Sequence, residues 1–202
     1  RKIEPCNLIY ATRPPCFAHV YKPLVGEDEA GATLWFGLEP TLENDDEEDI
    51  KEQIVERLLR DAPQAERFDD DKQFIDMLDK MIEKTCKVGT NPLLNNPIIS
   101  QARELIGLGE APIYVTEDQL ERLKYVIARD LVKNGPLETL LSDEQLEDIH
   151  SVGLSRIIMD HKVFKSVISN IRFKDSAVLN QYLRSMSERI GRPVSDSKPI
   201  ID

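Results

Sequence analysis

The chain has 202 residues, enough for one large domain or two small ones, and its 41% hydrophobic and 31% charged residues are ordinary for a globular protein. Its net charge of −11 argues against a nucleic-acid binder and against a polybasic membrane-surface domain, because both rely on Lys and Arg. The sequence has no apolar run of about 18 residues, and Lys2, Glu4 and Asn7 in the first ten residues are not what a signal peptide is expected to contain. Three widely spaced cysteines are typical of reduced thiols in a cytoplasmic protein.

A β-hairpin and an acidic helix are predicted first. Strand-forming residues fill 16–25 and 33–40, and the segment GEDEAGA between them has the composition of a turn. Asn44 can cap a helix whose first turn, 45–48, is acidic and complements the helix dipole. The apolar stripe of this helix is expected at Ile50, Ile54, Val55, Leu58 and Leu59.

The next elements are two more helices and a boundary. A helix is expected from about residue 70 to 87, with Phe74, Leu78 and Ile82 four residues apart. Asn96 followed by Pro97 predicts a short helix that stops at Gly107. The glycine-rich segment 107–112 is the best place to divide the chain into two subdomains.

The second half is predicted to hold a capped helix, a small sheet and a final helix. Thr116 and Gln119 form a capping box, and Ser142 with Gln145 can form a second one. From residue 147 to 173 the apolar period approaches two, which predicts three short strands. Asp175 then caps the last helix.

The expected fold class is therefore α+β, with a leading hairpin and helical subdomain followed by a small antiparallel sheet with packed helices. The expected division is 1–110 for the leading subdomain and 111–202 for an α/β-sandwich-like domain. The chain does not begin with Met, and Ile200–Ile201 looks like the start of a further element. We therefore expect a piece of a longer protein.

The sequence carries no complete catalytic motif. None of its nine glycines is followed by Lys, so the phosphate-binding loop G-x-x-x-x-G-K-[ST] is absent. The motifs G-x-G-x-x-G, H-E-x-x-H, C-x-x-C and G-x-S-x-G are absent as well. Whether the chain is part of an enzyme is left open by this evidence, and no catalysis is expected of it alone.

Cysteine and histidine offer only weak candidates for a site. Cys6, Cys16 and His19 have the spacing C-x9-C-x2-H, but a structural zinc ion needs a fourth, remote ligand, so packing is the favoured interpretation and no metal is expected. His150 and His161 each lack an identifiable Ser, Cys or Asp partner, which favours a structural role for both.

Three arginines at the end of the last helix are the better candidates. Arg184, Arg189 and Arg192 suit a helix C-terminus, where cations are stabilised by the helix dipole. Arg192, however, lies beyond the helix between a glycine and a proline. A guanidinium on a stiff turn is well suited to bind a phosphate or a carboxylate.

Two motifs resemble a known family. The text YVIARDLVKNGPLETLLSDEQLEDI is similar to the pattern Y-x-hydrophobic-x-R-D-hydrophobic, G-P-hydrophobic and E-D-I in the amino-terminal domain of type II/type IV secretion ATPases, in particular the archaeal GspE-like branch that drives pilus and archaellum assembly. The end, RIGRPVSDSKPIID, resembles the pattern R-x-G-R-x-hydrophobic-S-x-x-x-P-hydrophobic-hydrophobic-D. The matching residues are Tyr125, Arg129, Asp130, Gly135, Pro136, Leu137, Asp143, Glu147, Asp148, Ile149, Arg189, Gly191, Arg192, Pro199 and Asp202.

The resemblance is good over 115–202 and looser over the first hundred residues. It departs from the family after E-D-I, where a strand with Val-Tyr-Val and His is usual and this chain has HSVGLSRIIMDHK. The strand pattern survives there, but the aromatic residues do not.

The resemblance implies the amino-terminal region of a hexameric motor that couples ATP hydrolysis in a following RecA-like domain to protein export or filament assembly. It implies ATP and Mg²⁺ as ligands of the parent protein, with Arg184, Arg189 and Arg192 reaching the nucleotide phosphates and Arg189 and Arg192 acting as arginine fingers. It also implies a homo-hexamer, an integral-membrane platform protein as partner, and a cytoplasmic location at the inner face of the cell membrane.

Two other interpretations remain open. One is a stand-alone, non-catalytic interaction or regulatory module of a pilus or secretion assembly, which the absent phosphate-binding loop favours. The other, weaker one is a small zinc protein that uses Cys6, Cys16 and His19.

Overall fold

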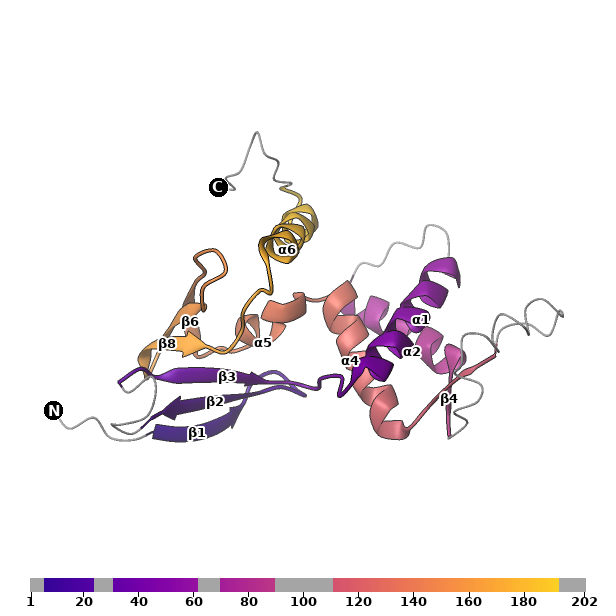
Figure 1. The fold of residues 1–202 in the computed structure, drawn as a ribbon, viewed down its shortest axis with the longest axis horizontal. Coiled ribbons are helices and arrows are strands. Elements are labelled where there is room, and N and C mark those ends of the chain that lie inside the picture. Colours follow the sequence, from indigo (N-terminus) through magenta and orange to yellow (C-terminus); the bar gives the residue numbers. More distant parts are fainter. Residues whose placement is uncertain (1–5, 24–30, 62–69, 90–110, 193–202) are drawn as a thin grey trace. The chain divides into compact units, whose positions relative to one another are not determined.

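The structure, a computed structural model, describes residues 6–23, 31–61, 70–89 and 111–192 (Figure 1). The chain forms two compact units. Unit 1 combines Arg1–Glu39 with Pro136–Asp202, and unit 2 is the continuous segment Pro40–Gly135 between them. Each unit has a hydrophobic core of its own.

Unit 1 is built on a six-stranded sheet with the strand order β1-β2-β3-β8-β7-β6. Its strands are β1 Cys6–Ala11, β2 Phe17–Lys22, β3 Leu34–Leu38, β6 Leu146–His150, β7 Ile158–His161 and β8 Lys165–Ser169. Neighbouring strands are antiparallel except β3 and β8, which run parallel and join the two distant chain segments of the unit.

One face of this sheet forms the core of unit 1. The buried side chains of that core are Ala18, Val20, Trp35, Leu140, Ile157, Met159 and Val167. Leu140 comes from the short helix α5, Glu138–Leu141, which contacts β3. Because strand residues alternate between faces, the opposite face of the sheet carries the exposed side chains of Phe17, Leu38 and Ile158.

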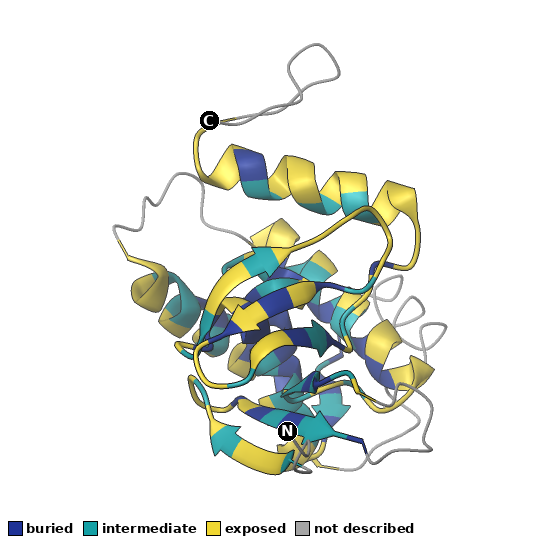
Figure 2. Ribbon diagram, turned by 90° about the vertical axis from the view of Figure 1, so that its left-hand side faces the viewer, coloured by how far each residue is buried: buried dark blue, intermediate teal, exposed yellow. Residues whose placement is uncertain are grey.

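The last helix of unit 1, α6, spans Ser176–Arg189. It begins where the side chain of Asp175 accepts a hydrogen bond from the amide of Val178. Most of α6 is exposed, as Figure 2 shows. Tyr182 is one of its partly buried residues, and its ring packs against Phe173 with 5.3 Å between ring centroids.

Unit 2 is mainly helical. It contains α1 Asp45–Asp61, α2 Asp71–Thr85 and α4 Glu117–Leu131, with a parallel pair of short strands, β4 Cys86–Val88 and β5 Ile113–Val115. Its core is aliphatic and includes Ile50, Ile54, Leu58, Leu78, Ile82, Leu123 and Ile127. The three helices contact one another pairwise, so each apolar stripe faces the same centre.

Several elements that the local sequence predicts are present in the structure. The α+β class is confirmed, as are the hairpin of β2 and β3, the N-caps of α1 and α6, and the capping box of Thr116 with Gln119. The predicted helix after Pro97 lies outside the described residues.

Other local predictions were wrong. Ser142 does not begin a helix: it ends α5, and its hydroxyl donates to Glu138 instead. Leu59 is 71% exposed, because the side of α1 that faces the core carries Ile50, Ile54 and Leu58, with Val55 packed against that core. Strand β1 was not predicted.

The organisation of the chain differs from the expected one. The expected boundary at 107–112 lies largely outside the described residues. The chain passes from unit 1 to unit 2 between residues 39 and 40, and returns to unit 1 between residues 135 and 136. The physical reason is the ladder between β3 and β8, which adds the leading hairpin to the sheet of the second half. That sheet is therefore mixed and not purely antiparallel. Among the described residues, no helix is both long and apolar enough to cross a bilayer.

Candidate functional site

The end of α6 places Arg192 on a fixed turn. Gly191 adopts a φ of 70°, a left-handed conformation that glycine accepts without strain. The amide of Gly191 donates to the carbonyl of Glu188, and the amide of Arg192 donates to the carbonyl of Ser187, at 3.0 and 2.9 Å. These two bonds form a Schellman motif, which pins the backbone of Arg192 just past the helix.

The three arginines do not form one cluster. Arg184 and Arg189 are five residues apart on α6, so their side chains leave the helix about 140° apart. Arg189 lies two turns after Tyr182, on the same side of the helix. Burial raises the pKa of Tyr182, and the charge of Arg189 partly opposes that rise. Arg189 and Arg192, at the end of the helix, are therefore better placed than Arg184 to bind one ligand together.

The surroundings of this turn favour an anion. Arg184, Arg189 and Arg192 are all exposed, and the described residues of α6 contain only one acidic side chain, Glu188. The carbonyl end of a helix repels anions by itself, so guanidinium groups are needed to reverse the local potential. The turn supplies them on a defined backbone.

The zinc interpretation has no geometric support among the described residues. Cys6 pairs with Lys22 at one end of the hairpin of β1 and β2, whereas Cys16 precedes Phe17 at the other end. Five residues of strand separate these ends, which is about 17 Å. His19 interacts with Asn7, at 2.8 Å between Nε2 and Oδ1, and not with a thiol.

His161 belongs to a buried hydrogen-bond network with Tyr10 and Asp143, partners that its sequence context did not suggest. The hydroxyl of Tyr10 donates to Asp143 at 2.5 Å and lies 3.1 Å from Nε2 of His161. Nδ1 of His161 accepts from the amides of Val163 and Phe164, so the proton of the neutral ring is on Nε2. Burial lowers the pKa of His161, and the nearby carboxylate of Asp143 opposes that decrease.

Asp143 is the centre of that network. Its carboxylate also accepts from Nε1 of Trp35 at 3.0 Å and from the amide of Gln145 at 2.9 Å. Burial, together with Asp143, raises the pKa of Tyr10, which therefore stays protonated and keeps donating. Asp143 belongs to the family-like motif between Tyr125 and Ile149. Its role in the structure is to hold β1, β3 and β7 together around α5.

Other motif residues also have structural roles. Arg129 makes two contacts with its neighbour Asp130, at 2.9 and 2.8 Å, and Asp130 also pairs with Lys51 of α1 at 3.3 Å. The pair of Lys51 with Asp130 ties α4 to α1 within unit 2. The ring of Tyr125 lies under the ammonium group of Lys133, with 5.9 Å to the ring centroid.

His150 has neighbours that its sequence context did not suggest. It lies near Asp148 and Asp160, and the ligand atoms of the three side chains are all within 4.8 Å of one another. Sequence reasoning missed this group because Asp160 is ten positions away and is brought close only by the pairing of β6 with β7. An alternating D-x-H pattern on a predicted strand was the signal that could have pointed to it.

The comparisons with known proteins give relatives but no activity. Uncharacterized protein MJ0900 of Methanocaldococcus jannaschii is 31% identical over 196 residues, which are 97% of this chain and 34% of that protein. Uncharacterized protein MJ1288 of the same organism is 29% identical over 91 residues, 44% of this chain and 36% of that protein. The chain spans about a third of the length of these relatives. No family model matches it.

Proposed function

We propose that this chain is the amino-terminal region of a hexameric secretion or pilus-assembly ATPase. In this proposal it couples ATP binding and hydrolysis in a following RecA-like domain to protein export or filament assembly. The observation that carries the proposal is the turn of Arg189, Gly191 and Arg192, which combines the family-like motif R-x-G-R with a backbone fixed by a Schellman motif.

The role of the arginines follows from phosphoryl-transfer chemistry. The transferred phosphoryl group spreads negative charge over its oxygens, and a guanidinium can hold two of them with parallel N–H bonds. Arg192 would supply this charge, Arg189 would assist it, and Arg184 would be a more distant phosphate ligand. Because the backbone of Arg192 is already fixed, only the freedom of its side chain must be lost when the nucleotide is bound.

The length of MJ0900 is compatible with this proposal. About two thirds of MJ0900 lies outside the match, which is room for a RecA-like domain with its own phosphate-binding loop. That domain would bind ATP and Mg²⁺, since the present chain has no such loop. The parent would work as a homo-hexamer in the cytoplasm, on an integral-membrane platform protein at the inner face of the cell membrane.

A stand-alone interaction module is the second candidate, and one observation favours it. Phe17 of β2 and Leu38 of β3 lie directly opposite each other on the outer face of the sheet and are 46% and 40% exposed. Ile9 of β1 is on the same face and is 59% exposed. Exposed apolar side chains that gather on one face are typical of surfaces that bind another protein.

The test is to express the complete protein that contains this chain and to measure ATP hydrolysis together with its mass in solution. The proposal predicts Mg²⁺-dependent hydrolysis and a ring of six subunits. A coding sequence that ends shortly after Asp202, or a longer protein that neither binds nor hydrolyses ATP, would contradict it and favour the interaction module.

A further inference from the structure

Two exposed strands of unit 1 bring together a set of metal-binding side chains. Asp148 and His150 are two residues apart on the edge strand β6, so both project from the same face. Asp160 of β7 is paired directly with Asp148 in the antiparallel ladder. All three residues are exposed, and their ligand atoms lie within 4.8 Å of one another.

This spacing suits a single ion. Two donor atoms of a tetrahedral Zn²⁺ ion are about 3.3 to 3.6 Å apart, because each bond is about 2.0 to 2.2 Å long. Donor atoms that lie up to 4.8 Å apart therefore need to approach each other by about 1.5 Å at most, which rotation of exposed side chains allows. They come from two hydrogen-bonded strands, so the backbone that carries them is ordered.

Without a bound cation, the arrangement of these three side chains is destabilising. Two carboxylates directly opposite each other on one face of an antiparallel pair repel. Within the part of the chain that the structure describes, no hydrogen bond or ion pair engages the side chain of Asp148, His150 or Asp160. A bound cation would remove the repulsion and use all three acceptors.

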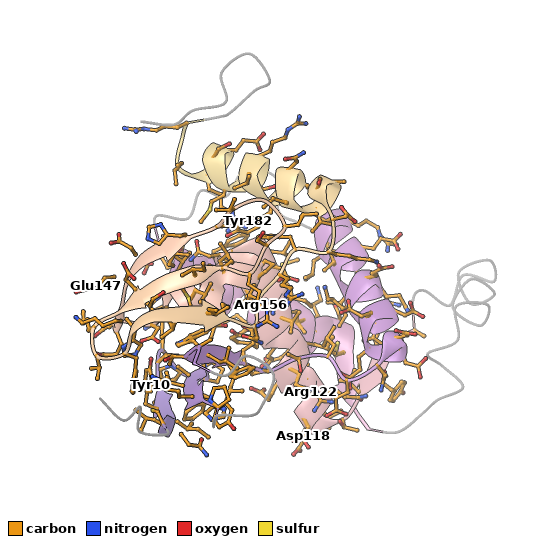
Figure 3. The ribbon with its side chains drawn as sticks, turned by 60° about the vertical axis from the view of Figure 1, so that its left-hand side comes forward. Tyr10, Asp118, Arg122, Glu147, Arg156 and Tyr182 are labelled. Carbon is orange, nitrogen blue, oxygen red and sulfur yellow. The ribbon has the colours of Figure 1, made fainter. Side chains whose placement is uncertain are left out.

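The strand geometry also contributes. The register of β6 against β7 shifts between Leu146 and Asp148, an irregularity at Glu147. Such bulges twist an edge strand and redirect its side chains, and they are frequent beside functional sites. Figure 3 shows Glu147 at the outer edge of the sheet.

We propose that Asp148, His150 and Asp160 bind a divalent transition-metal ion. Two carboxylate oxygens with one imidazole nitrogen suit ions such as Mn²⁺ or Zn²⁺, whereas Mg²⁺ and Ca²⁺ prefer oxygen ligands alone. The remaining coordination positions face solvent and are filled by water or by a ligand from a partner. The ion cross-links the edge strand β6 to β7. The site does not depend on the proposed ATPase function.

The test uses the 202-residue chain, isotopically labelled, with Mn²⁺ as a paramagnetic probe and an excess of Mg²⁺ to saturate diffuse acidic binding. The expected result is that amide signals of 148–150 and 158–160 broaden first, at less than one equivalent of Mn²⁺. Broadening that begins elsewhere, such as at the acidic start of α1, overturns the proposal.

Variants separate a specific site from surface charge. The double variant Asp148→Asn with Asp160→Asn, and His150→Gln alone, should each weaken Mn²⁺ binding by at least about tenfold. Glu147→Gln is the matched control, since it removes a carboxylate from the same strand, and it should change the affinity less than about twofold. Equal effects of control and site variants overturn the proposal. The emission of Trp35, the single tryptophan, verifies that every variant is folded.

Discussion

The two units of this protein are stabilised in different ways. Unit 2 is one continuous segment whose helices meet in an aliphatic core. Its main buried ion pair joins Glu47 to Arg122. Unit 1 is assembled from two distant segments, and its core contains a polar network centred on Asp143. The comparison teaches that local hydrophobic patterning predicts most of unit 2, whereas the sheet of unit 1 depends on a few specific long-range contacts.

The candidate sites follow the same division. The arginine turn at the end of α6 and the group around His150 are both in unit 1. The described charged contacts of unit 2, such as those of Glu47 with Arg122, join its own helices. Unit 1 therefore carries the groups that are suited to ligands, and unit 2 carries contacts that are suited to packing.

The largest effect is expected from Asp143→Ala. The change leaves the buried donors of Tyr10 and Trp35 without an acceptor, which should lower the free energy of unfolding by about 4 kcal/mol. Urea unfolding followed by the emission of Trp35 measures it in unit 1. Glu144→Ala, at the exposed neighbouring position, is the control and should cost less than about 0.5 kcal/mol. A loss below about 1 kcal/mol for Asp143→Ala would show that the network is dispensable.

In unit 2 the matching experiment is Arg122→Ala. Glu47 is 1% exposed and lies 2.6 Å from the guanidinium of Arg122. Burial raises the pKa of Glu47, but hydrogen bonds from Arg122, the amide of Glu43 and Gln119 outweigh it and lower the pKa overall. Removing Arg122 should therefore cost about 3 kcal/mol, measured by urea unfolding followed by helical circular dichroism.

Lys124→Ala is the control for Arg122→Ala. Lys124 pairs with the more exposed Glu83 at 2.8 Å, so its loss should cost much less than the loss of Arg122. Similar losses for both variants would contradict the distinction between a buried and a surface pair.

The junction of the two segments of unit 1 is tested by Gly37→Ala. A Cβ atom at Gly37 would lie 2.9 Å from Cγ2 of Thr139 and 3.1 Å from the ring of Trp35. The crowding should cost about 2 kcal/mol. In the Thr139→Ser background, which removes the methyl group and keeps the hydroxyl that bonds Glu39 at 2.9 Å, the cost should be smaller. An unchanged cost would mean that the two segments do not meet as described.

The smallest effect is a pH dependence of unit 1. His161 has a lowered pKa in the folded state because it is buried, so its charged form is less favourable in the folded than in the unfolded chain. Stability should be complete above about pH 6.5, the ordinary value for histidine, and should fall as the pH decreases below it. Unfolding monitored by Trp35 at a series of pH values measures the loss. A His161→Gln variant with the same dependence would assign it to other groups.

How much the sequence revealed depends on the distance between the interacting residues. The caps at Asn44, Thr116 and Asp175 act within three residues, so each was predicted from the local sequence. Strand β1 lacks a clear alternation because most of its residues are exposed, and its register exists only through β2. The ladder of β3 with β8 joins residues more than 130 positions apart, which no local pattern encodes.

The candidate sites show the same limit. Arg192 stood out because glycine and proline flank it, and the Schellman motif has a local sequence signal in Gly191. Asp160 could not be connected with His150, since the contact depends on strand register. The prediction for Ser142 was wrong because this residue follows the helix α5 and does not precede one. Its hydroxyl therefore donates to the side chain of Glu138, four residues earlier.

The most direct test of the proposed function is the rate of ATP hydrolysis by the complete parent protein carrying Arg192→Ala. Arg172→Ala, another exposed arginine of unit 1, serves as the matched control. The account predicts that Arg192→Ala lowers kcat by more than about tenfold without unfolding the protein, because a guanidinium at the transferred phosphoryl group is lost, while Arg172→Ala leaves kcat unchanged. Equal turnover in both variants would contradict the account and leave Arg192 as a cation that only ends its helix.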